Sequence, residues 1–260
     1  MNAENARQCL TDIGCSPDRI NPLAELVEAG RLTEAKQRLR CLRCDLMEEL
    51  HVCQRRVDQL DWLIRETERA KPKKQQGGSE MSNVLVISTS LRAKSNSDIL
   101  AERLIAGAKD AGHQVEQISL KGKTVGFCKG CLACQKTQKC VLKDDAVAIA
   151  EKVMHTDTLV FVTPIYYYEM SGQMKTLLDR MNPLYSSDYK FRNVYMLSVA
   201  AEDENFVPQK AVSGLQGWID CFEKAELAGS LFCGGIGDAG EAEEKTKEQQ
   251  EAYEFGKALK

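Results

Sequence analysis

Apolar segments typical of buried strands alternate with amphipathic helical segments from Asn83 to the end of the chain, and this alternation constrains the fold more than any other feature. The first predicted strand, NVLVIST, has a continuous apolar run at its centre, as expected of a strand that is covered on both faces. Strands are predicted over residues 83–89, 113–120, 157–163, 193–200 and 227–236, and helices over 97–111, 144–155, 172–182, 208–224 and 241–259. Five β/α units predict an α/β fold with a doubly wound, five-stranded parallel sheet.

Residues 1–70 form a segment of a different kind, without a convincing strand. Asn21-Pro22 is expected to start a short helix that ends near Gly30, and Thr33 is expected to cap a longer helix that reaches about residue 70. In the longer helix apolar residues recur every seven positions, interrupted by Arg43, in two offset series: Leu39, Leu46, Cys53 and Leu60, and then Leu50, Val57 and Ile64. A single seam of this kind cannot bury itself. We therefore expect an all-α helical hairpin or a coiled-coil segment that meets a partner chain.

Three segments follow from these patterns: helices over 1–70, a linker over 71–80 and a second domain over 81–260. The linker, KPKKQQGGSE, is charged and contains Gly, so it is predicted to be flexible.

The charge balance excludes some classes of partner. The chain has 35 basic and 38 acidic residues, a net charge of −3, and so no electrostatic footprint for nucleic acid or for an anionic membrane surface. Its polar N-terminus is unlike a signal peptide, and no apolar run approaches the ~18 residues of a membrane span. A cytoplasmic location is expected. The 11 cysteines are odd in number and do not suggest a disulfide framework.

Ligands of a doubly wound sheet bind beyond the carboxyl ends of its strands, so the loops there are the candidate site. The first loop, STSLRAKSNS, has hydroxyls, Arg92 and Asn96 just before a helix N-terminus, which together suit a phosphate dianion. The third loop places three consecutive tyrosines at a strand end, followed by Ser171-Gly172 and a new helix. Aromatic side chains there can flank a planar ring. The residues by themselves therefore predict a ligand with a phosphate and a flat aromatic ring.

Residues 81–260 resemble the flavodoxin-like NAD(P)H-dependent FMN reductases, in particular the branch that contains the iron–sulfur flavoproteins. The matching motifs are Ser90-x-Arg92-x-x-Ser95-Asn96-Ser97, Pro164-Ile165-Tyr166, Gln173-x-Lys175-x-x-x-Asp179-Arg180, and a cysteine run that is followed by Asp144-Asp145. Two departures are visible: the first loop opens with Thr89-Ser90-Leu91 instead of Gly-Ser-Pro, and the fourth-strand loop reads AAEDEN where the family is rich in glycine.

The resemblance implies a flavodoxin-like sheet that binds FMN, with the flavin receiving hydride from NADH or NADPH. It implies phosphate contacts from Ser90, Arg92, Ser95, Asn96 and Ser97, ring contacts from Pro164, Ile165, Tyr166 and Tyr167, and a further wall from Ala200 and Ala201. No side chain is expected to act as a catalytic acid or base, because the chemistry belongs to the flavin.

The cysteine run consists of Cys128, Cys131, Cys134 and Cys140. Spacings of this kind can bring four thiolates around one centre, and the resemblance to iron–sulfur flavoproteins suggests a [4Fe–4S] cluster. A tetrahedral zinc site and a loop of reduced thiols beside the flavin are the alternatives.

Three functions are compatible with these features. The first is an FMN-dependent oxidoreductase that passes electrons from NAD(P)H to a small acceptor such as a quinone, azo or nitro compound. The second is an iron–sulfur flavoprotein that transfers electrons with ferredoxin, and the third is a redox-sensing interaction protein. A homo-oligomer is expected, with the N-terminal helices as one possible means of assembly.

Overall fold

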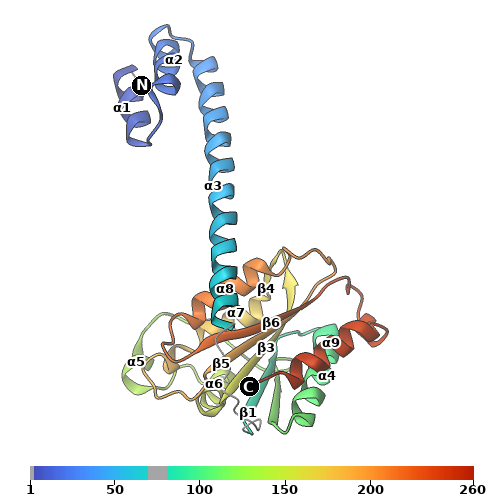
Figure 1. The fold of residues 1–260 in the computed structure, drawn as a ribbon. Coiled ribbons are helices and arrows are strands. Elements are labelled where there is room, and N and C mark those ends of the chain that lie inside the picture. The colour runs from blue at the N-terminus through green and yellow to red at the C-terminus, as the bar shows by residue number, and fades with distance from the viewer. Residues whose placement is uncertain (1–2, 70–80) are drawn as a thin grey trace. The chain divides into compact units, whose positions relative to one another are not determined.

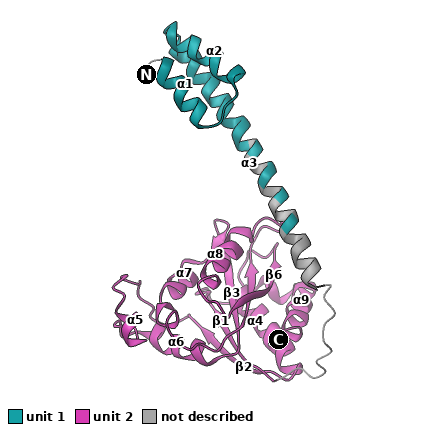
Figure 2. Cartoon of the chain, turned by 60° about the vertical axis from the view of Figure 1, so that its left-hand side comes forward, with its two compact units in different colours: residues 1–76 teal, residues 77–260 magenta. Residues whose placement is uncertain are grey.

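The computed structural model of the chain describes residues 3–69 and 81–260, and in the long helix the side chains at 48, 50, 51, 54, 55, 57–59 and 61–69 are outside the described set. The chain divides into two compact units, residues 1–76 and 77–260, shown in teal and magenta in Figure 2. The linker predicted over 71–80 lies outside the described residues.

The described residues of the N-terminal unit, 3–69, form three helices: α1 (Ala3–Asp12), α2 (Pro17–Glu28) and α3 (Leu32–Arg69). Their small core contains Ala6, Leu10, Ile20, Leu23, Val27 and Ala35, with Leu39 and Leu42 packed against it. The sequence did not predict α1, whose buried face consists of two residues in a mostly polar segment. The predicted start of α2 at Asn21-Pro22 was wrong, because the helix begins at Pro17, where a proline at the first position loses no helical hydrogen bond.

The C-terminal unit contains a parallel sheet in the order β2-β1-β3-β5-β6, with the short β4 paired antiparallel to β3 (Figure 1). The strands are β1 (Asn83–Ser88), β2 (Gln114–Ser119), β3 (Thr158–Tyr166), β4 (Glu169–Met170), β5 (Asn193–Val199) and β6 (Glu226–Cys233). This arrangement confirms the predicted doubly wound α/β sheet. From β1 the chain adds β2 on one side and then β3 on the other, so the strand order reverses between β1 and β3, and a sheet of this kind holds its ligands at that point.

Two hydrophobic cores lie on the two faces of the sheet, because alternate strand residues point to opposite sides. One core joins Ile87, Phe161 and Met196 to α6, α7 and α8, and the other joins Val86, Val160 and Leu197 to α4 and α9. The helices are α4 (Asn96–Asp110), α5 (Ala133–Thr137), α6 (Asp145–His155), α7 (Gly172–Asp179), α8 (Gln209–Ile219) and α9 (Thr246–Lys257), with single 3₁₀ turns η1 (Asn182–Leu184) and η2 (Glu241–Glu243).

Helices α4 and α9 cross at two glycines. A Cβ atom at Gly107 would lie 1.9 Å from the Tyr253 carbonyl oxygen, and one at Gly256 would lie 1.9 Å from the Leu104 carbonyl oxygen. Only glycine permits this approach of two backbones, so these residues fix how closely α9 covers its face of the sheet.

Three predicted helices are shorter than expected, and α7 ends at Asp179 instead of residue 182. Helix α8 ends at Ile219 instead of residue 224, because a turn follows in which the Phe222 N–H donates to the Ile219 carbonyl oxygen. This turn places the Phe222 ring against Trp218, with ring centroids 4.6 Å apart. The last helix begins at Thr246 instead of residue 241, because the Glu241 carboxylate accepts the backbone N–H groups of residues 237 and 238. In the described part of the chain, no helix combines the length and the apolar character needed to cross a membrane.

Candidate functional site

The serine-rich loop between β1 and α4 is buried at its helical end. Ser90, Ser95 and Ser97 are all buried, and the Ser95 hydroxyl caps α4 by accepting the N–H of Asp98 at 3.2 Å. The Ser88 hydroxyl donates to the Asp98 carboxylate, which fixes the first turn of the helix. The backbone N–H groups of the first helical turn have no partner within the helix, and they provide the positive end of its dipole. The loop therefore gathers hydroxyls and N–H donors at one point.

Two of the predicted phosphate contacts also hold another loop in place. The Asn96 side-chain amide donates to the Asp238 carbonyl oxygen at 2.7 Å and accepts the Ala242 N–H at 3.1 Å, so it is committed to the segment after β6. The Arg92 guanidinium donates to the Gly237 carbonyl oxygen at 2.7 Å, but its side chain remains exposed. In this arrangement Asn96 keeps its backbone N–H and one side-chain N–H for a ligand, whereas Arg92 keeps several N–H donors.

A buried cluster of hydroxyls joins the first loop to the third. The Ser171 hydroxyl lies 3.0 Å from the hydroxyl of Thr89 and accepts the Thr163 hydroxyl at 3.2 Å, and all three side chains are fully buried. Ser171 also caps α7 by accepting the N–H of Met174. Because each of these groups has a partner, the cluster fixes the two loops relative to each other.

The three tyrosines form the tip of a hairpin that the sequence did not predict. Strand β3 continues past Thr163 to Tyr166 and pairs there with Glu169 of β4. The two residues at the turn, Tyr167 and Tyr168, have φ angles of 51° and 65°. Two left-handed residues are typical of the tight hairpin turn that normally requires Asn-Gly, so tyrosine here is strained. Tyr167 is 99% exposed, so its ring extends freely beyond the sheet edge.

The other predicted ring contacts fall in two places, at the end of β3 and just after β5. Pro164 and Ile165 are half-buried and Tyr166 is exposed, at the end of β3. Ala200 is buried at the end of β5, where its carbonyl oxygen accepts the Ile236 N–H at 2.9 Å, and Ala201 is exposed.

The segment 234–242 after β6 is a wall of the site that sequence reasoning missed. A Cβ at Gly234 would lie 2.4 Å from the Cα of Asp203, so only glycine lets this segment pack against the loop after β5. Arg92 and Asn96 join it to the first loop. The signal was present in the sequence as CGGIGDAG at a strand end, a glycine-rich loop one strand later than the resemblance leads one to expect.

A buried ion pair holds the cysteine loop to the end of α7. The Arg180 guanidinium binds both oxygens of the Asp144 carboxylate, at 2.6 and 2.8 Å, and donates to the Gly126 carbonyl oxygen at 2.8 Å. Its Nη2 also donates to the Cys140 Sγ at 3.4 Å. The hydrogen bonds from Arg180 hold the pKa of Asp144 below its ordinary value of 3.8, against the opposing effect of burial. Arg180 is therefore a structural anchor of the loop.

The four cysteines of the predicted cluster line one cavity together with Arg180 and Asn182. Burial raises the pKa of the Cys134 thiol, and its nearness to the other three cysteines raises it further. The Asn182 amide donates to the Cys128 Sγ at 3.6 Å. Within residues 3–69 and 81–260, however, no three Cys, His, Asp or Glu side chains are gathered so that they could hold a metal ion. The loop brings the four sulfurs to one cavity without drawing them together.

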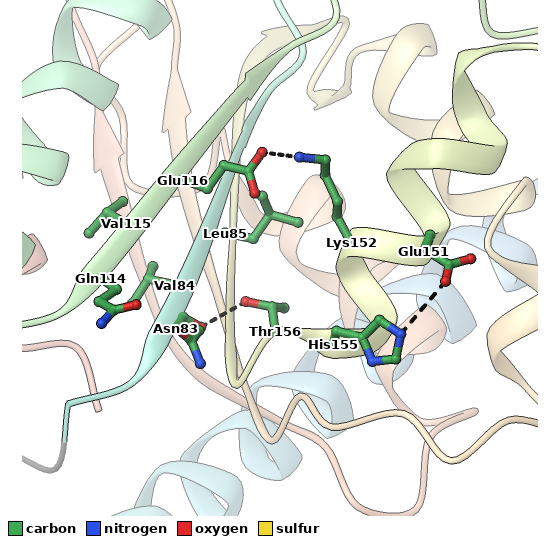
Figure 3. A pocket seen from close by; sticks show the side chains of 10 residues that line it. All are labelled: Asn83, Val84, Leu85, Gln114, Val115, Glu116, Glu151, Lys152, His155 and Thr156. Carbon is green, nitrogen blue, oxygen red and sulfur yellow. Dashed lines mark hydrogen bonds and ion pairs between the residues drawn. The ribbon is translucent and has the colours of Figure 1, made fainter.

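A larger groove, of about 440 Å³, lies at the opposite edge of the sheet (Figure 3). It begins at Asn83 and Gln114, the first residues of β1 and β2, and is closed by the end of α6. Two pairs of side chains line it: the Lys152 ammonium contacts the Glu116 carboxylate, and the His155 Nε2 lies 3.7 Å from a Glu151 carboxylate oxygen. This groove is at the amino ends of the strands, away from the loops described above.

FMN fits the chemistry of the loops at the carboxyl edge. Buried serine hydroxyls, an exposed guanidinium and a helix N-terminus suit its phosphate, and the exposed tyrosine hairpin suits a flat ring. The individual contacts that the resemblance implied stay a prediction.

Comparison with known proteins identifies the family. The profile of the NADPH-dependent FMN reductase family matches residues 82–219, more than half of the chain. An iron-sulfur flavoprotein of Archaeoglobus fulgidus is 37% identical over 100 residues, 38% of this chain and 49% of that protein. One of Methanosarcina thermophila is 27% identical over 175 residues, 66% of this chain and 91% of that protein.

The first curated relatives are thus matched over about half of their length. A solved NAD(P)H:quinone oxidoreductase from Methanothermobacter marburgensis shares the fold, with a TM-score of 0.54 and 17% identity over 70% of this chain and all of that one. The family profile, the parallel sheet and the loops at its carboxyl edge agree, and the chain belongs to the NADPH-dependent FMN reductase family.

Proposed function

We propose that this chain binds FMN at the carboxyl edge of its sheet and passes electrons from NADH or NADPH to a small acceptor such as a quinone, azo or nitro compound. The observation that carries the proposal is the buried hydroxyl cluster of Thr89, Thr163 and Ser171, which joins the phosphate-type loop to the tyrosine hairpin. Family membership supports the choice of FMN. When bound, FMN supplies the hydride chemistry, and the protein binds and orients it.

In this proposal the first loop holds the phosphate. Ser90, Ser95 and Ser97 contribute hydroxyl groups, Asn96 contributes its backbone N–H, and Arg92 contributes the positive charge. Because Arg92 is exposed and anchored by one hydrogen bond to residue 237, it can direct its remaining N–H groups to a phosphate.

The hairpin and the wall after β5 hold the ring. Pro164, Ile165 and Tyr166 line one side, Tyr167 covers an open face, and Ala200-Ala201 close another side. The small alanines leave room for a planar group. The strained turn directs the Tyr167 ring away from the protein core. In an extended strand the same side chain would lie on a face of the sheet.

The purified chain tests the proposal directly. We expect a bound flavin spectrum and steady oxidation of NADH or NADPH with a quinone as acceptor. Tyr167→Ala should weaken flavin retention, whereas Tyr185→Ala, at an exposed tyrosine on η1's C-terminal side, should not. A protein that binds no added FMN would contradict the proposal.

The second candidate function is electron transfer through an iron–sulfur cluster, and the surroundings of the cysteine cavity favour it. Arg180 is fully buried beside the four cysteines, and its Nε has no hydrogen-bond partner. Such a cation, with an N–H to spare, suits a thiolate-bound cluster of net negative charge. The iron-sulfur flavoproteins among the relatives point the same way.

The surface around this cavity suits an acidic partner such as ferredoxin. Six lysines between residues 121 and 143 are exposed, no acidic residue lies among them, and none forms an ion pair within the described part of the chain: Lys121, Lys123, Lys129, Lys136, Lys139 and Lys143. Exposed lysines that form no ion pair attract an acidic protein and speed its association.

Anaerobic purification followed by iron and sulfide analysis separates the two candidates. About four irons per chain, lost in Cys131→Ser but retained in Cys221→Ser, would support the cluster. Turnover that requires reduced ferredoxin would support the second function, and NAD(P)H turnover without iron would support the first. The cytoplasmic location and a homo-oligomeric state stay predictions.

A further inference from the structure

Helix α3 extends well beyond the small core of its own unit. The core ends near Leu42, yet the helix continues to Arg69. Along this extension the described seam residues are uncovered: Leu46 is 37% exposed, Leu60 is 58% exposed and Cys53 is exposed. Packing against the core of its own unit therefore covers the first turns of the α3 seam. The seam residues that follow remain uncovered.

The sevenfold repeat gives each seam residue a position in a coiled coil. If Leu39 begins the d series, the d positions are Leu39, Leu46, Cys53 and Leu60, and the a positions are Arg43, Leu50, Val57 and Ile64. The assignment of the last three rests on the sequence, since their side chains are outside the described set. From residue 46 to residue 64 both series are apolar without interruption, over almost three heptads.

We propose that the extension of α3 pairs with the same helix of a second copy of this chain, in a parallel and in-register two-stranded coiled coil. β-branched residues at a combined with leucine at d favour two parallel strands, and Val57, Ile64, Leu46 and Leu60 follow this rule. A single polar residue at an a position, here Arg43, fixes the register at some cost in stability.

The flanking charges fit the same arrangement. In a parallel pair a g residue faces the e residue five positions later in the other copy. Arg56 at g then faces Asp61 at e, an opposite-charge pair, and Glu49 at g faces the neutral Gln54. The two flanking pairs thus include one opposite-charge pair and no like-charge pair.

The cysteines of α3 provide a test with controls on the same helix. Cys53 occupies a d layer, so the two copies bring their Cys53 side chains face to face, within the distance that a disulfide requires. Cys41 and Cys44 fall at f and b, on the outside of the pair. All three are exposed in the single chain, so exposure by itself does not distinguish them.

The experiment treats the full-length, reduced protein with diamide, which accepts two electrons and two protons from two thiols as one S–S bond forms. We expect a covalent dimer, with the disulfide mapped to Cys53 of both chains by mass spectrometry of the linked peptide. Cys53→Ser should reduce the rate of its formation at least tenfold, whereas Cys41→Ser and Cys44→Ser should leave it unchanged.

A second variant tests the seam independently of the thiol. Leu46→Glu places a charge in a d layer and should also abolish the Cys53 disulfide, while circular dichroism shows that the helices remain. Sedimentation should show that this variant is a monomer, because the two α3 helices no longer pair. If the C-terminal units also associate, formation of the Cys53 disulfide is the deciding measurement. Dimers linked through other cysteines would overturn the proposal. A folded protein that forms no Cys53 disulfide, because something else covers α3, would also overturn it.

Discussion

Replacing Arg180 with methionine should strongly destabilise the C-terminal unit, because it leaves the Asp144 carboxylate buried without its cation. The Arg180 side chain is 0% exposed and that of Asp144 is 12% exposed. Methionine fills most of the space but provides no donor, so the two short contacts to the carboxylate and the one to the Gly126 carbonyl oxygen are lost.

The size of the effect follows from what remains around Asp144. Breaking a buried ion pair from one side costs about 3–5 kcal/mol. The carboxylate keeps the N–H groups of Gly126 at 2.8 Å and Ala146 at 3.2 Å, and it touches solvent, so the lower end applies. We expect a loss of about 3 kcal/mol in the free energy of unfolding, roughly a hundredfold in the unfolding equilibrium. Arg180→Lys keeps the charge without the two-pronged geometry and should lose less.

The assay is urea unfolding followed by the fluorescence of Trp218, whose ring stacks on Phe191 in the same core as α7. The other tryptophan, Trp62, belongs to α3 and is replaced by phenylalanine in all variants. The double variant with Asp144→Asn should be less destabilised than the sum of the single variants, by about 1–3 kcal/mol. Additive losses, or a loss below about 1 kcal/mol for Arg180→Met, would refute the reasoning.

The same pair predicts a pH dependence with a definite sign. The pKa of Asp144 is lowered by folding, so its contribution is complete above the ordinary value of 3.8 and is lost as pH falls through the lower folded value. The stability difference between the parent protein and Arg180→Met should therefore be large at neutral pH and shrink below about pH 4.

Three further predictions concern other parts of the chain. Arg92→Ala should weaken FMN binding roughly ten- to hundredfold, measured by flavin fluorescence on titration, because a charge-assisted bond is lost; equal affinity in Arg92→Ala and in Lys109→Ala, at the far end of α4, would contradict its role. Gly256→Ala should lower the free energy of unfolding by about 1–3 kcal/mol in the same urea titration, because its Cβ would lie 1.9 Å from a carbonyl oxygen. The control Gly217→Ala in α8, with no atom within 4 Å of its Cβ, should be neutral or stabilising. Residues 81–260 expressed alone should be soluble and bind FMN, since their sheet and both cores are complete without the helices; an insoluble fragment would argue against two independent domains.

The sheet was predictable from the sequence because its signal is local. Strands such as β1 and β3 are covered on both faces and so appear as continuous apolar runs, and the cap residues Ser95 and Ser171 precede the helices that they start. The candidate loops followed from the sheet, since their place at the carboxyl edge depends on topology and not on detail.

Features that depend on distant residues or on strained backbone were not predictable. The pairing of Arg180 with Asp144 joins residues 36 positions apart, and the sequence gives no sign of which acid an arginine will meet. The turn at Tyr167-Tyr168 has no Asn or Gly to announce it, so the predicted strand stopped at residue 163. The commitment of Asn96 to the segment after β6 likewise follows from packing that no local pattern encodes.

Helix α7 has a consequence for how variants of this protein should be interpreted. Its first turn is fixed by the Ser171 hydroxyl cluster under the tyrosine hairpin, and its last residues lead into Arg180, which holds the cysteine loop. The helix has eight residues, a rigid rod of roughly 12 Å. Hydrogen bonds hold both ends, so we expect a displacement at one end of α7 to be felt at the other. The candidate flavin loops and the cysteine loop are therefore connected through one short helix, and a substitution in either should be assayed at both.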